Sequence, residues 1–270
     1  MSAPPAVARL RSLVRTFPSA LLGYSGGVDS ACLAVVLRQE LGRERMLAVI
    51  GRSASFSATQ EETARRLATQ FDLPLLEVET HELEDPRYLA NPLNRCFFCK
   101  SELWARLTAE AQARELAVVC DGTIADDLRE HRPGRAAGVR AGIRSPLAEA
   151  GMSKADVRAT ARALGLPVWD APASPCLSSR VAYGVAITAR RLAEVEAAEA
   201  YLRGLGVSGD LRVRHLGERA RIEVERAWIP WLTERSDAVR RRLVALGFGG
   251  VEIDPRGYRR GGLLPAPGGR

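Results

Sequence analysis

The chain has 270 residues, of which 46% are hydrophobic and 26% are charged, a balance typical of a globular protein with one or two domains. No apolar run approaches the ~18 residues that a membrane-spanning helix needs, and the N-terminus lacks the pattern of a secretory signal, so we expect a cytoplasmic protein with no membrane partner. The formal net charge of +7, from 39 basic and 32 acidic residues, is compatible with a polyanionic partner and equally with an ordinary solvated surface.

Short apolar runs alternate with longer amphipathic stretches in the first two thirds of the sequence. This alternation predicts an α/β fold, a doubly wound parallel sheet with right-handed crossovers. The predicted strands are 20–24, 46–50, 75–78 and 117–120. Residues 81–99 are irregular and contain Pro86 and Pro92, and helical periodicity resumes at about Lys100. We expect this insertion to deliver a CxxC pair to a helix N-terminus.

A second helical pattern follows Ser153 and ends in Gly-x-Pro, and the proline-rich loop 170–184 comes next. We place a domain boundary after this loop, so that residues 1–184 form the larger domain. The smaller α+β domain is predicted to span 185–262, with a helix at 188–205, strands at 211–215, 221–224 and 251–253, and further helix through Val244. Residues 263–270 are expected to be a disordered tail.

A glycine-rich turn, SGGVDS, stands where the first strand gives way to the first helix. Backbone N–H groups and the positive end of the helix dipole converge there, so the turn can bind an anion. The predicted ligand-binding residues are Ser25, Gly26, Gly27, Asp29 and Ser30. Asp29 would repel a bare phosphate and therefore indicates a bridging Mg²⁺. The turn resembles the SGGxDS signature of the PP-loop ATP pyrophosphatases, which implies ATP as cofactor and adenylation as chemistry.

Five cysteines, an odd number, argue against a disulfide framework. Cys32 and Cys120 lie in apolar segments and are expected to be buried. Cys96 and Cys99 form the CxxC, which alone is compatible with a zinc pair, a redox dithiol or an iron–sulfur pair, but no second CxxC completes a zinc site. Together with Cys176 they can hold three irons of a [4Fe–4S] cluster and leave the fourth open to sulfide. Unrelated thiols are the alternative.

Arg212 and Arg214 are two residues apart in a predicted strand, which places both guanidiniums on one face. Two such side chains can clamp a phosphate through fork-shaped hydrogen bonds. The alternative is that they pair with Glu223 and Glu225 on the next strand.

Acidic residues mark two further places. Asp121, followed by Asp126 and Asp127, comes after the fourth strand, at the carboxyl end of the sheet where α/β proteins bind ligands. Metal binding or contact with a ribose is possible there, and loop capping is the alternative. Glu196 and Glu199 share one helix face, where they could assist proton transfer, bind metal or simply be solvated.

Several motifs in their order resemble one family, the LarE-type sulfur transferases, which make pyridinium-3,5-bisthiocarboxylic acid mononucleotide for the nickel-pincer nucleotide cofactor. The motifs are GYSGGVDS, NRCFFCK, DGTIADD, REHRPG, RSPLAEAGMSKADVR, WDAPASPCLSSRVAYG, LRVRHLGERARIEVE and GYRRG. They span nearly the whole chain. Two departures are Ile124, where an asparagine is expected, and the phenylalanines in the CxxC spacer, one of which could stack on adenine.

The resemblance implies that residues 25–30 bind the pyrophosphate of ATP and that Cys176 bears the sulfur. It also implies that Arg212, Arg214 and Arg259 hold the phosphate of a small nucleotide substrate. In family members with a CxxC, sulfur comes from a cluster renewed by sulfide or another sulfur donor, whereas the others sacrifice the sulfur of the cysteine that matches Cys176. Cys96 and Cys99 place this chain with the first kind, the three-cysteine iron–sulfur type. We further expect a homo-oligomer.

Two other functions fit parts of the sequence. A PP-loop tRNA thiolase can also carry three cysteines, but only 6% of the residues are aromatic and no separate RNA-binding module is visible, so nucleic acid is not an expected partner. A non-catalytic ATP- and redox-sensing module would bind ATP without releasing pyrophosphate.

Overall fold

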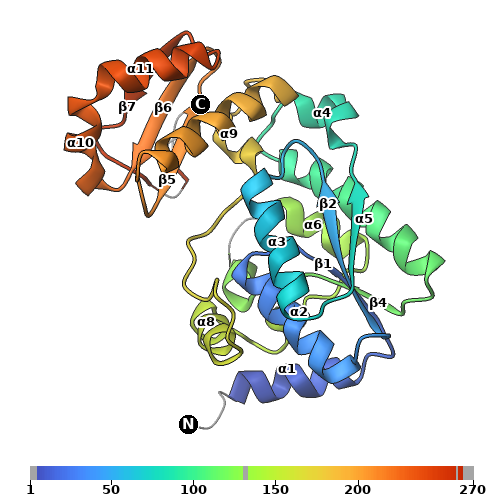
Figure 1. Cartoon of the computed structure of the whole chain (residues 1–270). Helices are drawn as coiled ribbons and strands as arrows, with labels where there is room; N and C mark the ends of the chain where they lie inside the picture. Colours follow the sequence, from blue (N-terminus) through green and yellow to red (C-terminus); the bar gives the residue numbers. More distant parts are fainter. Residues whose placement is uncertain (1–4, 130–132, 260, 264–270) are drawn as a thin grey trace. The chain divides into compact units, whose positions relative to one another are not determined.

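The protein is described from a computed structural model, which describes residues 5–129, 133–259 and 261–263 (Figure 1). The chain forms two compact units. Unit 1 comprises Met1–Glu82 and Asn94–Ser174, and unit 2 comprises Leu83–Leu93 and Pro175–Arg270. Within the described ranges, no helix is long and apolar enough to cross a membrane.

Unit 1 is built on four parallel strands in the order β3–β2–β1–β4. The strands are β1 (Ala20–Gly23), β2 (Met46–Arg52), β3 (Leu75–Glu79) and β4 (Val118–Cys120). Beyond β4, Cys120 forms one isolated parallel bridge with Arg144. The predicted α/β fold with a parallel sheet is therefore confirmed, and each strand begins within one residue of its predicted start.

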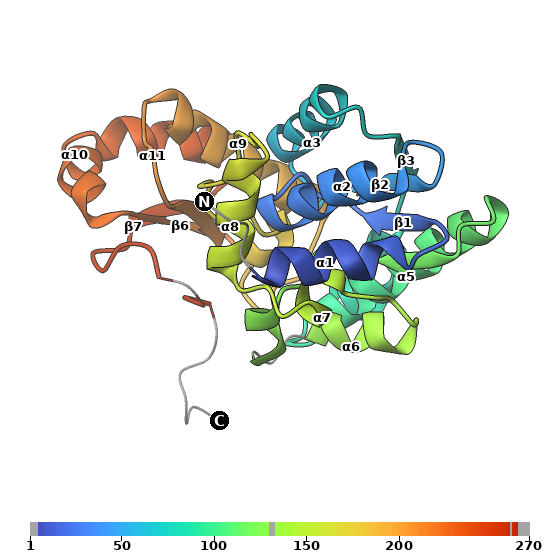
Figure 2. The same cartoon turned by 90° about the horizontal axis from the view of Figure 1, so that it is seen from below.

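Helices cover both faces of this sheet (Figures 1 and 2). They are α1 (Pro5–Arg15), α2 (Val28–Leu41), α3 (Ala58–Gln70), α5 (Arg95–Ala113), α6 (Pro133–Arg140), α7 (Pro146–Glu149) and α8 (Lys154–Ala163), with the 3₁₀ turn η2 (Ala125–Arg129). A further 3₁₀ turn, η1 (Glu82–Glu84), begins with the last residue of the first segment of unit 1 and continues into unit 2. Leu22 packs in the apolar cluster that includes α1, α2, α3 and α8, whereas its neighbour Leu21 packs with Trp104 of α5. Burial on both faces explains why the strands read as continuous apolar runs.

Two of the five cysteines belong to this core. Cys32 and Cys120 have no exposed surface, as the sequence predicted. Burial raises the pKa of the Cys32 thiol to about 12 and raises that of Cys120 above its ordinary range. Neither thiol is therefore a nucleophile at neutral pH.

Unit 2 contains a three-stranded sheet in the order β5–β6–β7, in which β5 and β6 are antiparallel and β6 and β7 parallel. Its strands are β5 (Leu211–His215), β6 (Arg219–Val224) and β7 (Gly250–Ile253). Its helices are α4 (Pro86–Leu89), α9 (Ala189–Gly204), α10 (Ile229–Glu234) and α11 (Ser236–Ala245), with 3₁₀ turns η3 (Leu177–Arg180) and η4 (Arg226–Trp228). The predicted smaller α+β unit is confirmed.

The segment Leu83–Leu93 belongs to unit 2 because its side chains are tied to the loop around Cys176. The Tyr88 hydroxyl lies 2.5 Å from Ser178 Oγ, and the Asn91 amide donates to the carbonyls of Ala182 and Val185 at 2.8 and 2.9 Å. The compact units divide after Ser174 and also include Leu83–Leu93 in unit 2, whereas we predicted a domain boundary after residue 184. The predicted domain boundary stays a prediction. The predicted tail lies, except for Leu263, outside the described residues.

Helix α8 begins with a capping box whose contribution to the stability of the protein should depend on pH. The Ser153 hydroxyl accepts from the backbone N–H of Asp156, whose carboxylate accepts from the backbone N–H of Ser153 at 2.9 Å. The Ser153 side chain, and then its backbone N–H, hold the pKa of Asp156 below its usual range. Asp156→Ala should therefore destabilise the protein by about 1 kcal/mol at pH 7.

The stabilisation by Asp156 is present above the pKa of the unfolded chain and is lost as the pH falls through the lower, folded pKa. Urea unfolding of wild type and Asp156→Ala between pH 7 and the acid limit of folding should show the two curves converging on acidification. Asp170→Asn, a change at an exposed aspartate, is the control. A constant difference at every pH would contradict the carboxylate as its source.

Candidate active site

The turn between β1 and α2 is shaped to receive an anion. Gly26 has φ +70°, and a Cβ there would lie 2.7 Å from Ala64 Cβ. Gly27 is the N-cap of α2 and supplies no side-chain acceptor for the first N–H groups of the helix. An uncapped helix N-terminus after a glycine turn leaves several donors for a phosphate oxygen.

Two serines and a glutamine hold this turn closed. Ser30 Oγ donates to the Gly27 carbonyl at 3.1 Å and accepts from the Ser25 backbone N–H at 3.2 Å. The Gln60 amide donates to the Ser25 carbonyl at 3.1 Å. The residues predicted from 25 to 30 are therefore brought together in one compact turn at the carboxyl end of β1.

Gly26→Ala should weaken ATP binding at least about tenfold, because the left-handed conformation and the contact with Ala64 both force the turn to move. Gly42→Ala is a matched control: Gly42 ends the same helix with φ +81°, and a Cβ at that position would have nothing within 4 Å. Calorimetric titration with Mg-ATP compares the two variants. Equal affinity in both would show that the shape of the turn does not matter for the nucleotide.

Asp29 lies in the first turn of α2 and forms an ion pair with Lys154, the first residue of α8. Lys154 Nζ is 2.8 Å from both carboxylate oxygens of Asp29, and the Lys154 backbone N–H donates to Asp126 at 2.8 Å. The side chains of Lys154 and Asp29 are 36% and 30% exposed, so the pair adds little to stability. It places an ammonium group beside the anion-binding turn.

The loop after β4 packs against the same turn. A Cβ at Gly122 would lie 2.9 Å from the Ser30 backbone nitrogen, so only glycine allows this approach. Asp121 fixes the loop: its carboxylate accepts from the Thr123 backbone N–H at 3.0 Å, the Thr123 hydroxyl at 2.8 Å and the Ser145 hydroxyl at 2.8 Å. Loop capping, one of the two alternatives from the sequence, is thus observed, and nucleotide contact by Asp121 stays a prediction. Ile124 is buried in the apolar core.

The CxxC lies in the first turn of α5, as the sequence predicted, although the helix begins at Arg95 rather than near Lys100. Cys96 and Cys99 are both half-buried and are separated by one helical turn. Cys176 belongs to unit 2, just before η3. Within the residues that the structure describes, no three His, Cys, Asp or Glu side chains group as a metal site requires, so the three-thiol cluster stays a prediction.

Arg180 is the main support of the loop that carries Cys176. Its side chain is 4% exposed and donates to Glu199 at 3.0 and 3.1 Å, to the Cys176 carbonyl at 3.1 Å and to the Pro175 carbonyl. Glu199 also accepts from the Val213 backbone N–H at 3.0 Å, so the loop is fixed to both α9 and β5. Glu199, which we considered for proton transfer or metal, therefore positions Arg180.

Arg212 and Arg214 lie on one face of β5, as predicted, and both are almost fully buried. Arg214 pairs with Glu223 at 2.8 Å, which was the alternative from the sequence, and donates to the Ser179 carbonyl at 3.1 Å. Arg212 lies over the Tyr258 ring. Burial, and then the nearby guanidinium of Arg180, lower the pKa of Arg212.

Arg259, the third predicted phosphate ligand, lies near the end of the described residues. Its guanidinium is half-exposed and 3.7 Å from the buried Asp254 carboxylate. The structure thus places all three predicted phosphate-binding arginines in unit 2, with two buried on β5 and one exposed after β7.

Comparison with known proteins agrees with this geometry. The chain is 36% identical over 255 residues to pyridinium-3,5-bisthiocarboxylic acid mononucleotide synthase of Lactiplantibacillus plantarum, covering 94% of this chain and 91% of the relative. The chain belongs to the LarE family. It is also 42% identical over 258 residues to an uncharacterised protein of Synechocystis sp., covering 94% of this chain and 95% of the relative. The NAD synthase family model matches residues 6–93.

Two residues of this LarE family member were not singled out from its sequence. Lys154 and Arg180 each stand inside a motif that carried the resemblance, SKADVR and CLSSR, yet neither has a local pattern that announces its role. One signal was present: the chain has only two lysines, Lys100 and Lys154, among its 39 basic residues. A lysine in a chain that otherwise uses arginine suggests that the position requires a compact ammonium group.

Proposed function

We propose that this protein is an ATP-dependent sulfur transferase that adenylates a carboxylate of a small nucleotide and replaces the activated oxygen with sulfur. The observation that carries the proposal is the turn at 25–30, where an uncapped helix N-terminus meets the Asp29–Lys154 pair. The name of the Lactiplantibacillus plantarum relative points to pyridinium-3,5-biscarboxylic acid mononucleotide as the substrate, and so to the nickel-pincer nucleotide cofactor.

In the first step the substrate carboxylate attacks the α-phosphorus of ATP, and pyrophosphate leaves. The free N–H groups at the start of α2 donate to the phosphates. Mg²⁺ fits the half-exposed Asp29 carboxylate beside those donors and would offset the phosphate charge. Lys154 exchanges Asp29 for a phosphate oxygen and stabilises the charge that develops on the leaving group.

In the second step the Cys176 sulfur attacks the carbonyl carbon of the acyl-adenylate, and AMP leaves with the oxygen that ATP activated. A thioester to Cys176 results. Removal of the Cα proton of Cys176 and cleavage of its Cβ–S bond then leave a thiocarboxylate on the product and dehydroalanine in the chain. Arg180 serves this second step by holding the backbone carbonyls of Pro175 and Cys176 in place.

A [4Fe–4S] cluster on Cys96, Cys99 and Cys176, with one iron open to sulfide, stays our prediction for how the sulfur is renewed. The half-buried thiols of Cys96 and Cys99, one helical turn apart, fit two of its ligands. When bound, such a cluster would supply sulfide as the transferable sulfur. No step above depends on it.

The substrate phosphate is assigned to the arginines of unit 2. Arg180, Arg212 and Arg214 are buried, and the carboxylates in contact with this group are Glu199 and Glu223. Burial lowers the pKa of Arg212, and the guanidinium of Arg180 lowers it further, so there is repulsion between these buried cationic groups. A phosphate dianion, joined by the exposed Arg259, would relieve it.

The test is a single-turnover reaction under anaerobic conditions with Mg-ATP and the biscarboxylate mononucleotide. We expect one pyrophosphate and one AMP for each thiocarboxylate formed, and a protein mass lower by one H₂S when no sulfide is added. Thiolated product without pyrophosphate would contradict adenylation. Binding of ATP without pyrophosphate release would favour the sensing module, and thiolation of tRNA alone would favour the tRNA thiolase. Light scattering tests the expected homo-oligomer.

A further inference from the structure

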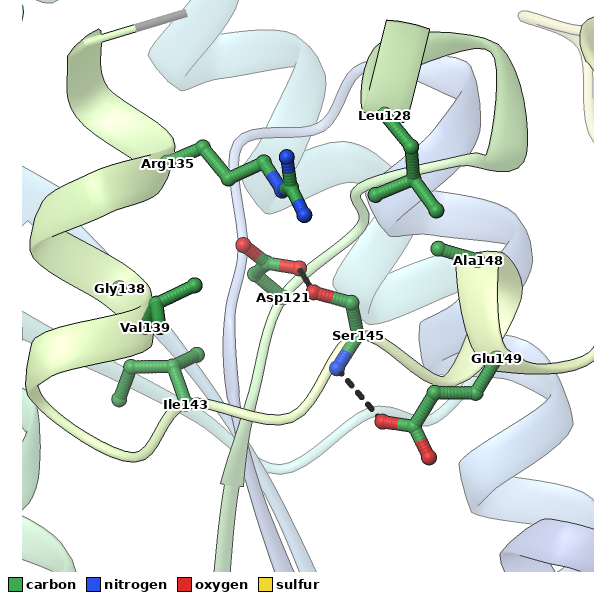
Figure 3. A pocket seen from close by; sticks show the side chains of 9 residues that line it. All are labelled: Asp121, Leu128, Arg135, Gly138, Val139, Ile143, Ser145, Ala148 and Glu149. Carbon is green, nitrogen blue, oxygen red and sulfur yellow. Dashed lines mark hydrogen bonds between the residues drawn. The ribbon is translucent and has the colours of Figure 1, made fainter.

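A pocket lies beside the loop that follows β4. It has a volume of about 210 Å³ and opens between η2, α6 and α7 (Figure 3). Neighbouring residues of one loop face different places: Gly122 packs against the anion-binding turn, whereas Asp121 lines this pocket. The pocket is therefore separate from the proposed ATP site, although both lie within unit 1.

The charged groups of the pocket are few and well defined. Arg135 extends from α6 over the pocket toward the Asp121 carboxylate, and no ion pair or hydrogen bond joins Arg135 to any residue that the structure describes (Figure 3). Glu149 is already neutralised by Arg144, which donates to it at 2.8 Å. Arg135 is therefore the cationic group that can meet a ligand. The Asp121 carboxylate already accepts three hydrogen bonds, from Thr123 and Ser145, and a carboxylate with about four acceptor positions can accept one more.

The rest of the lining is apolar and small. Leu128 and Val139 line the pocket and are 43% and 66% exposed, respectively. Ile143 and Ala148 continue this apolar wall. A volume of this size corresponds to about seven water molecules at ~30 Å³ each, and it is below the roughly 300–1,000 Å³ of pockets for drug-sized ligands. A ligand of six to eight non-hydrogen atoms suits such a space, by the same rough comparison.

We propose that this pocket binds a small zwitterionic α-amino acid, with its carboxylate on Arg135, its ammonium group on Asp121 and a short side chain against the apolar wall. A simple anion would be repelled by Asp121, and a simple cation by Arg135. A zwitterion satisfies both groups at once through charge-assisted hydrogen bonds, and the planar guanidinium matches a carboxylate. The proposal goes beyond sulfur transfer and does not rest on it.

Calorimetric titration of the full-length protein with L-alanine, and with L-cysteine under reducing conditions, tests the proposal. Propionate lacks the ammonium group and ethylamine lacks the carboxylate, so both should bind at least about tenfold more weakly, the loss expected for one charged hydrogen bond. Arg135→Gln and Asp121→Asn should each weaken amino-acid binding by at least about the same factor. Arg140→Gln is the matched control, because Arg140 is on the same helix but lies over Phe97.

Asp121 also fixes its loop, so a second variant guards against a simple loss of structure. Val139→Trp, at the exposed rim, should abolish binding by filling the pocket while the melting temperature stays unchanged. The proposal is overturned if neither amino acid binds at millimolar concentration, if Arg135→Gln binds them as well as wild type does, or if propionate binds as tightly as L-alanine. The last result would mean a site for simple anions.

Discussion

Lys154→Met is expected to slow substrate-dependent pyrophosphate release by about 10²- to 10³-fold, the usual effect of removing one preorganised donor from developing negative charge. Lys154 Nζ lies 2.8 Å from both oxygens of Asp29, at the N-terminus of α2 where phosphates would bind. In the absence of nucleotide the ammonium group neutralises Asp29. When Mg-ATP arrives, Asp29 can turn to the metal, and Lys154 to a phosphate. The loss should therefore fall mainly on kcat rather than on KM for ATP.

The variant should remain folded, because exposed ion pairs contribute only ~0–1 kcal/mol. Arg162→Met is a matched control on the same helix: it removes a cation that lies over the Trp169 ring instead of facing the turn. A continuous assay for pyrophosphate with saturating substrate measures the rate in both variants. A rate for Lys154→Met within a factor of about two of wild type would show that the lysine only balances Asp29, contrary to the role we propose.

The sequence predicted those features that local patterns determine. Buried strands read as short apolar runs, and the uncapped start of α2 followed from the glycines of SGGVDS. The sequence placed the first turn of α5 near the CxxC but not at Arg95. Asn94 is the N-cap and is of a residue type that often caps helices, but it makes no side-chain cap hydrogen bond here. Element boundaries of this kind depend on backbone geometry more than on residue type.

Long-range pairings were harder to predict, and the reason differs from residue to residue. Lys154 and Asp29 are 125 positions apart, and each alone looks like an ordinary helix-terminal charge. The grouping of Leu83–Leu93 with unit 2 depends on Tyr88 and Asn91, which reach a loop about ninety positions away. Arg214 was predicted on the correct face, with Glu223 as a possible partner, because residues two apart in a strand share a face. The register places Glu223 opposite Arg212 and Arg221 opposite Arg214, so the observed Arg214–Glu223 pair is a diagonal one.

Hydrogen bonds and an ion pair around Cys176 explain how a loop without regular secondary structure can hold one thiol in a fixed place. The segment APASPC has two prolines and no apolar periodicity, yet the next residues are held by side chains of three elements: Tyr88 on α4, Glu199 on α9 and Arg214 on β5. The Arg214 contact runs to the backbone of the loop, the Tyr88 and Glu199 contacts run to the side chains of Ser178 and Arg180, and none of the three involves the sulfur. The thiol is therefore left as the reactive end of a fixed support, the arrangement that a positioned nucleophile requires.

Cys176→Ser is expected to reduce thiolated product by roughly 10³-fold or more, because it removes the atom that is transferred. Serine keeps the size of the side chain, and the loop contacts of Arg180 run to backbone carbonyls, so the support should persist. Pyrophosphate release should continue near the wild-type rate, since adenylation depends on the turn at 25–30 and on Lys154. Separate assays of pyrophosphate and of thiocarboxylate on one sample show whether adenylation now proceeds without sulfur transfer.

Cys96→Ala and Cys99→Ala decide where the sulfur comes from. If both variants still complete one turnover and Cys176 of each is found as dehydroalanine, the sulfur is that of Cys176 and the CxxC has another role. If both lose product as completely as Cys176→Ser does, and reconstituted wild type shows iron and sulfide that all three variants lack, the three thiols act as one cluster. Full product from Cys176→Ser would contradict both routes, because each of them requires that sulfur atom at the end of its fixed loop.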